Sequence, residues 1–339
     1  MKSPMELPMD CYMWLMRPER VTSGPRVLHL ETTTRCNLTC IICPRTSALK
    51  HPANQDGDRS HGDLSLVQFC QLLSECGRVR RFRFHGLGEP LLNPDLVAMV
   101  SEAKRRGVET EFTTNATLLS PEIGKELIRA GLSCLTISLD GATASTYETI
   151  RVGARFNSVI DNVRQLTETK RQMGSRHPIL SVNMVVTRQN LSELPGILKL
   201  SREIGAVEFR ASPLEPTEDT MVGWLPDPLA WRQVACSAKK LAKHVGIAFE
   251  DHGASRWTGG PSAAQAAARL CHRPWQTLYV RLNGYITPCC NISDPHVLGE
   301  QNAFDAGLDS IWNSSQLRQF RNQLKRGPIP PNCLKCSSM

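Results

Sequence analysis

Strand-like and helix-like segments alternate along the chain from residue 26 to about residue 245. The strand candidates are 27–32, 81–86, 108–115, 134–141, 180–187 and 207–212. The amphipathic stretches between and after them are 64–76, 94–107, 121–131, 158–173, 192–205 and roughly 227–245. Six βα units in succession predict an α/β fold with a parallel sheet and right-handed crossovers, either a partial barrel or an open doubly wound sheet.

Polar side chains recur at every second position of these strand candidates. Successive side chains of a strand point to opposite faces, so one face packs on helices and the other faces inward. Buried polar groups must be satisfied by water, by a ligand or by one another. We expect a curled sheet around a polar ligand; the alternatives are a half-solvated sheet and a polar core that satisfies itself. The inward-facing residues are His29, Glu31, Arg83, His85, Glu111, Thr113, Asn115, Thr136, Ser138, Asp140, Asn183, Glu208 and Arg210.

Composition and charge exclude some functions. The 339 residues are 41% hydrophobic and 21% charged, as in a globular protein with a sizeable core. No apolar run reaches the roughly 18 residues of a membrane helix, and residues 9–16 are too short for a secretory signal. We therefore expect a cytoplasmic protein that does not bind membranes. The formal charge is +8, but the sequence has no basic block with interleaved aromatics, the pattern that would predict binding to nucleic acid.

Three cysteines lie within eight positions after the first strand candidate: Cys36, Cys40 and Cys43. Thirteen cysteines in a chain without an export signal indicate metal or redox chemistry rather than disulfides. Structural zinc takes four ligands and catalytic zinc prefers histidine, whereas a ferredoxin-type cluster takes four cysteines. Three thiolates on a short loop can instead hold a [4Fe-4S] cluster with one open iron.

This C-x3-C-x2-C loop resembles that of the radical S-adenosylmethionine (SAM) superfamily, which also places it after the first strand. The resemblance implies a partial (β/α)6 barrel over residues 26–250, in which the open iron binds SAM. One electron, from a donor such as flavodoxin or ferredoxin, would cleave SAM to a 5′-deoxyadenosyl radical that takes hydrogen from the substrate. Ile42 matches the apolar residue that packs near the adenine.

Further motifs of the superfamily follow in order at strand ends, where barrel enzymes build their sites. The motif GLGEP (86–90) matches the segment that holds the SAM amino group, and Arg151 matches an arginine that pairs with the SAM carboxylate. The resemblance thus implies these SAM-binding residues: Gly86, Gly88, Glu89, Asn115, Ser138, Asp140 and Arg151.

A second cysteine set lies near the C-terminus. Asn283-Gly284 predicts a hairpin turn, whose ends would bring Cys271 and Cys289 together, and Cys333 and Cys336 follow the last predicted helix, 308–327. This spacing resembles the twitch form of the SPASM extension of radical SAM enzymes. It implies one fully ligated auxiliary [4Fe-4S] cluster, with Cys290 as an alternative to Cys289 as the ligand, and with bound zinc or free thiols as the alternatives to the cluster.

The predicted organisation has four parts. They are an N-terminal extension (1–25), the radical SAM core (26–250), a Gly/Ala/Ser-rich linker or loose helix (251–270), and a small α+β auxiliary-cluster domain (271–339).

The resemblance defines the reaction type better than the substrate. About 25 residues precede the first strand, few for a peptide-recognition module, and the single auxiliary cluster resembles that of aminocyclitol dehydrogenases. We therefore expect a small polar substrate, a sugar, cyclitol or nucleoside of specialised metabolism (as in antibiotic biosynthesis), that is dehydrogenated or decarboxylated. The alternatives are a peptide maturase and a non-catalytic metal scaffold that binds nucleic acid. The acid/base candidates are Glu31, His85, Glu208 and Arg210.

Overall fold

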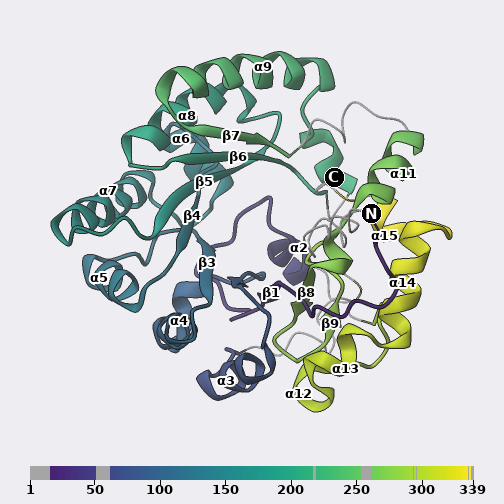
Figure 1. The fold of residues 1–339 in the computed structure, drawn as a ribbon. Helices are drawn as coiled ribbons and strands as arrows, with labels where there is room; N and C mark the ends of the chain where they lie inside the picture. Colours follow the sequence, from purple (N-terminus) through teal and green to yellow (C-terminus); the bar gives the residue numbers. More distant parts are fainter. Residues whose placement is uncertain are drawn as a thin grey trace, which may run out of the picture.

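The computed structural model describes residues 16–50, 62–216, 219–252, 261–292, 294, 296–334 and 336 of the chain. Its strands form one curved sheet in the order β7-β6-β5-β4-β3-β2-β1-β8-β9 (Figure 1). The strands are β1 (Val27–Leu30), β2 (Arg81–Phe84), β3 (Glu109–Thr114), β4 (Cys134–Ser138), β5 (Ile179–Val186), β6 (Glu208–Pro213), β7 (Ala248–Asp251), β8 (Thr277–Val280) and β9 (Ile286–Thr287).

Helices cover the outer side of the curved sheet, and a second group lies beside the N-terminal residues (Figure 1). The helices of the βα units and their connections are α2 (Pro44–Lys50), α3 (Leu66–Glu75), α4 (Leu96–Arg105), α5 (Pro121–Ala130), α6 (Ala144–Ile150), α7 (Phe156–Gln172), α8 (Leu194–Glu203) and α9 (Pro228–Val245). The helices of the C-terminal part are α11 (Pro261–Leu270), α12 (Ala303–Ala306), α13 (Leu308–Trp312), α14 (Ser315–Lys325) and α15 (Pro331–Leu334). None of the described helices is long and apolar enough to cross a membrane.

The predicted partial (β/α)6 barrel is confirmed. Each of β1 to β6 pairs in parallel with the next strand of the chain. The short strand β7, which was not predicted, adds to the outer side of β6. Since β7 and β9 form the two ends of the sheet order, the barrel is open between them.

The strands β2 and β4 are shorter at their carboxyl ends than the segments predicted for them. β2 ends at Phe84 rather than residue 86, and β4 ends at Ser138 rather than residue 141. After β4, the Val185 N–H of β5 donates to a side-chain oxygen, Asp140 Oδ1, at 2.7 Å. This bond takes the place of a backbone hydrogen bond between the two strands. The alternation of polar and apolar residues continues through these ends and therefore does not mark them.

The C-terminal hairpin extends the barrel sheet and does not form a sheet of its own. β8 and β9 pair antiparallel around the predicted turn, where Gly284 has a φ of +87°, a conformation that favours glycine. β8 also pairs in parallel with β1, with His29 opposite Tyr279. The auxiliary region is thus joined to the first strand of the core by backbone hydrogen bonds.

The predicted helix 308–327 is two helices, α13 and α14. The Ser314 side chain accepts a hydrogen bond from the Leu317 N–H and so begins α14. Asn313 leaves the helix and bonds the Val21 backbone, accepting from its N–H at 2.8 Å and donating to its carbonyl at 2.9 Å. A capping serine within a continuous amphipathic pattern is the signal for this break.

The lumen-facing polar residues of neighbouring strands pair largely with one another. Arg81 and Arg83 of β2 form ion pairs with Glu111 of β3. The Thr136 and Ser181 hydroxyls share a hydrogen bond of 2.7 Å. The remaining pairs are Ser212 to Asn183 at 2.8 Å, and Arg210 to Glu208 at 3.1 Å and to Glu250 at 3.0 Å. In this part of the lumen the polar side chains satisfy one another. This is the alternative to a polar ligand that the sequence left open.

Residues 16–25 pack on the C-terminal helices. Arg321 of α14 is fully buried and donates to the carbonyls of Pro274 at 2.8 Å and Glu19 at 3.1 Å. The Trp275 indole N–H donates to the Pro18 carbonyl at 2.7 Å. The described part of the predicted N-terminal extension is therefore anchored to the auxiliary region. Residues 1–15 and 253–260, which carry the rest of the extension and part of the predicted linker, lie outside the described residues.

Candidate active site

The three-cysteine loop runs from the end of β1 to α2. Backbone hydrogen bonds tie it to the end of α6 and the residues that follow: the Ile41 N–H donates to the Ile150 carbonyl at 3.0 Å and the Thr39 N–H to the Val152 carbonyl at 3.1 Å. Cys40 is buried, while Cys36 and Cys43 are half-buried. The loop is thus held at the carboxyl end of the strands with its thiols partly accessible.

The GLGEP motif packs directly under this loop. The Glu89 N–H donates to the Arg35 carbonyl at 2.8 Å. A Cβ at Gly88 would lie 2.3 Å from the Thr33 carbonyl oxygen and 2.6 Å from that of Arg35. Only glycine permits this approach of the two backbones.

Glu89 is 3% exposed and takes its hydrogen bonds from the third strand and its own turn. Its carboxylate accepts from the Thr114 hydroxyl at 2.6 Å, the Asn115 N–H at 2.7 Å and the Leu91 N–H at 3.3 Å. Burial raises the pKa of Glu89, and these donors oppose the rise. Its remaining acceptor capacity is available to a cationic group.

Asn115 joins the end of β3 to the cysteine loop. Its side-chain amide donates to Asn37 Oδ1 at 3.0 Å, and Asn37 donates in turn to the Thr117 hydroxyl at 2.8 Å. The next residue, Ala116, has a φ of +58° and is fully buried. Such strain persists only where the surroundings impose it.

Asp140 and Arg151 form a buried ion pair beside Cys40. Arg151 donates from Nε and Nη2 to Asp140 Oδ2, each at 2.7 Å. Burial lowers the pKa of Arg151, but the Asp140 carboxylate outweighs it, and the net shift is upward. Ser138 is buried at the end of β4. Ile42 packs in a separate apolar cluster with Ile150, Leu214 and Met221.

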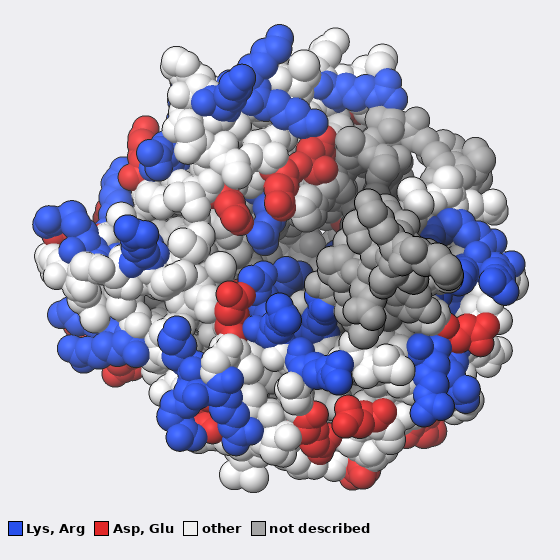
Figure 2. Space-filling model, viewed as in Figure 1, with Lys and Arg blue, Asp and Glu red and all other residues white. Residues whose placement is uncertain are grey.

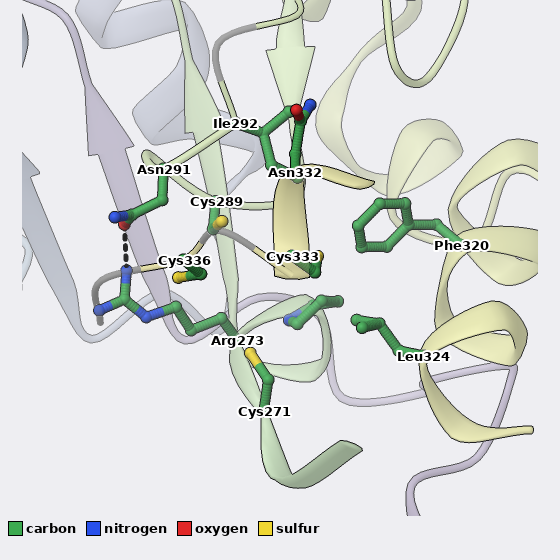
Figure 3. A pocket seen from close by; sticks show the side chains of 11 residues that line it. Cys271, Arg273, Cys289, Asn291, Ile292, Phe320, Leu324, Asn332, Cys333 and Cys336 are labelled. Carbon is green, nitrogen blue, oxygen red and sulfur yellow. Dashed lines mark hydrogen bonds between the residues drawn. The ribbon is translucent and has the colours of Figure 1, made fainter. Parts of the chain in front are cut away.

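The second cysteine set meets in one pocket. Cys271, Cys289, Cys333 and Cys336 line it, together with apolar residues of α14 (Figure 3). The chain segments after α11, after β9 and around α15 each bring thiols to it. Cys290 does not line this pocket, so the structure favours Cys289 over Cys290 as a ligand.

The chemistry of both thiol sets fits iron–sulfur clusters. Burial raises the pKa of Cys40 to about 11 and that of Cys333 to about 12, so these thiols are neutral until a metal displaces their protons. Among the described residues, no three His, Cys, Asp or Glu side chains converge tightly enough for a single metal ion. Four cysteine thiols around one pocket are the ligand set that a fully ligated cubane takes.

A thiol–histidine cluster lies between the barrel and the auxiliary pocket. It consists of Cys290, His29 and His85. Burial alone would raise the pKa of Cys290, but hydrogen bonds from both imidazoles bring it well below its usual range. His29 Nδ1 is buried and has no hydrogen-bond partner within the described chain. The sequence pattern placed His29 in the lumen, but local spacing contains no signal that joins it to Cys290.

The four acid/base candidates lie in different places. His85 belongs to the thiol–histidine cluster. Glu31 accepts from the Leu87 N–H at 3.3 Å and the Leu282 N–H at 3.2 Å, so it joins the GLGEP turn to the C-terminal hairpin. Glu208 and Arg210 pair with each other on β6. The structure therefore does not bring these four side chains together.

Family models match both parts of the chain. The model of the radical SAM superfamily matches residues 30–200, and that of the SPASM iron-sulfur cluster-binding domain matches residues 271–337. The first accounts for half of the chain and includes the three-cysteine loop. The second begins at Cys271 and includes the whole auxiliary pocket.

Similar proteins extend the match over nearly the full length. A tungsten-containing aldehyde ferredoxin oxidoreductase cofactor-modifying protein of Pyrococcus furiosus is 25% identical over 92% of this chain and 87% of its own. The mycofactocin maturase MftC of Mycobacterium tuberculosis is 27% identical over 91% and 76%, and the PqqA peptide cyclase of Gluconobacter oxydans is 26% identical over 93% and 83%.

A solved structure shares the fold. Streptococcus suis SuiB, determined with bound S-adenosylmethionine, superposes with a TM-score of 0.69 at 17% identity, over 90% of this chain and 68% of that one. With the two family matches, this fold and the two thiol sites lead to one conclusion. The chain belongs to the radical SAM superfamily, and it is an enzyme with a [4Fe-4S] cluster, S-adenosylmethionine and a C-terminal SPASM domain for auxiliary iron–sulfur binding.

Proposed function

We propose that this enzyme is a peptide maturase, which abstracts hydrogen from a side chain of a peptide bound in the lumen. The observation that carries the proposal is the match to a maturase and a peptide cyclase over more than 90% of the chain, auxiliary region included. This reverses our preference from the sequence for a small sugar-like substrate.

The geometry removes the main argument for a hydroxyl-rich ligand. That argument assumed that the polar lumen residues await a partner, yet Arg83, Thr136, Ser181 and Arg210 already have partners on neighbouring strands. A sugar would have to replace these bonds without gain.

In the proposed mechanism, Cys36, Cys40 and Cys43 hold the cluster. When bound, the cluster and SAM supply one-electron, hydrogen-abstracting chemistry. Gly88 and Glu89 shape the wall under the loop, and Glu89 has the charge to receive the amino group of SAM.

The other SAM contacts of the proposal come from neighbouring strand ends. Gly86 and Ser138 complete the cradle, Asn115 fixes the loop through Asn37, and Ile42 provides an apolar surface. The pair of Asp140 and Arg151 keeps a cation beside Cys40, in position for a carboxylate.

On the substrate side, we assign His85 as the residue that holds or moves a proton. Of the four candidates it is the one beside the auxiliary pocket. A cluster in that pocket would accept the electron that oxidation of the substrate radical releases. Glu31 acts as a structural bridge in this proposal, and Glu208 and Arg210 as part of the barrel wall. Lys and Arg side chains gather at the centre of the face in Figure 2, which favours peptides with acidic groups.

The test supplies the reconstituted, reduced enzyme with SAM and two sets of compounds. One set holds peptides with deuterated side chains and acidic residues, and the other holds deuterated sugars and cyclitols. We expect peptides to stimulate formation of 5′-deoxyadenosine and to transfer deuterium to it. Transfer from the sugars or cyclitols, with none from peptides, would refute the proposal.

A further inference from the structure

One cation stands in the wall of the auxiliary pocket. Arg273 lines it with the four cysteines (Figure 3). Its Nη1 donates to Asn291 Oδ1 at 2.9 Å and to Cys290 Sγ at 3.6 Å. Asn291 donates in turn to Glu215 Oε1 at 3.2 Å. The guanidinium is thus held in place by a hydrogen-bonded chain and not only by its position on the backbone.

No ion pair joins Arg273 to an aspartate or glutamate of the described residues. The groups that flank its guanidinium are cysteine side chains: Cys271, Cys289 and Cys336 line the pocket beside it, and Cys290 accepts its hydrogen bond. Once the pocket cysteines ligate a cluster as thiolates, their negative charge would compensate the positive charge of Arg273.

We propose that Arg273 is a positioning residue that provides the fixed positive charge of the auxiliary site and sets the reduction potential of its cluster. A cubane with four thiolates carries net negative charge, and its reduction adds one more. A neighbouring cation in a poorly solvated site stabilises the reduced form more than the oxidised form. Hydrogen bonds and charges near cluster ligands tune potentials in this way.

The experiment compares Arg273→Gln, Arg273→Lys and Arg318→Gln in the reconstituted holoenzyme. Arg318 is an exposed residue of α14. Its substitution removes the same charge from the same region, but at a position where solvent and salt screen the charge. Iron content is measured first, and the potential of the auxiliary cluster then comes from a redox titration followed by electron paramagnetic resonance. We expect a more negative midpoint in Arg273→Gln, a smaller shift in Arg273→Lys and none in Arg318→Gln.

Each outcome decides the matter without any substrate, so the result is independent of the proposed peptide function. An unchanged midpoint in Arg273→Gln at full iron content overturns the proposal. Loss of auxiliary iron in Arg273→Gln but not in Arg273→Lys supports it, since the charge then holds the thiolates together. Loss in both variants overturns it, because the side chain would act by packing.

Discussion

At the scale of single residues, Cys289 and Cys290 are adjacent in sequence and face different sites. The Cys289 side chain lines the auxiliary pocket and that of Cys290 meets His29 and His85. We expect Cys289→Ala to lower iron from about eight to about four per chain, and Cys290→Ala to keep all of it. Iron and sulfide assays measure this. Equal losses in the two variants would contradict the assignment.

His85 is separated from the other acid/base candidates by its surroundings. We expect His85→Gln to lower turnover of the peptide roughly 100-fold, since a glutamine amide can keep a hydrogen bond but cannot take up or release a proton. SAM cleavage without substrate should remain. Glu208→Gln, which alters a residue of the barrel wall, is the control and should stay within about twofold. Product analysis by mass spectrometry checks both.

At the scale of elements, the turn after β2 packs directly against the backbone of the cysteine loop. A Cβ at Gly88 would overlap two carbonyl groups of that loop, whereas a Cβ at Gly77 meets nothing within 4 Å. We expect Gly88→Ala to lose the SAM-binding cluster, about four irons, and with it SAM cleavage, while Gly77→Ala keeps both. Full iron in Gly88→Ala would show that the loop adapts.

Helix α6 leads to Arg151, and a carboxylate caps its start. Glu193 accepts from the Ala142 N–H at 2.6 Å and from the Thr143 hydroxyl at 3.1 Å. Burial would raise the pKa of Glu193, but these donors and Thr146 lower it below the usual 4.5. A lowered folded-state pKa stabilises the protein above the unfolded pKa, and the gain is lost as the pH falls through the folded value.

We therefore expect Glu193→Gln to lower the free energy of unfolding by about 1 kcal/mol at pH 7. The difference from the wild type should vanish as the pH falls below about 4. Denaturant titrations at several pH values measure it. A difference that is constant with pH would mean that the charge of Glu193 is not involved.

The elements also show which parts of the fold a sequence can predict. Local periodicity and Gly or Pro boundaries located the core strands and helices within a few residues, and motif spacing located both thiol sets. Four features escaped: the strand β7, the pairing of β8 with β1, the break at Ser314, and the meeting of Cys290 with His29 and His85. The pairing of β8 with β1 and the meeting of Cys290 with the two histidines depend on contacts between residues more than 200 positions apart, which no local pattern encodes.

At the scale of the whole molecule, Arg321 joins the N-terminal residues to the auxiliary region. Burial lowers the pKa of Arg321 to about 9, and its guanidinium carbon lies 4.4 Å from the centroid of the Trp312 ring. We expect Arg321→Ala to lower the free energy of unfolding by about 3 kcal/mol, because it opens a cavity and leaves carbonyls unpaired. The exposed Arg318→Ala on the same helix should change it by less than about 0.5 kcal/mol. Urea unfolding compares them.

The parallel pairing of β8 with β1 has a consequence for biosynthesis. On the ribosome, the strand that leads into the three-cysteine loop emerges some 250 residues before its neighbour. Until translation nears its end, one edge of β1 is bare and open to wrong partners. We therefore expect the first cluster to be inserted only after translation has completed this wall of the barrel, and chains truncated before residue 277 to aggregate rather than mature.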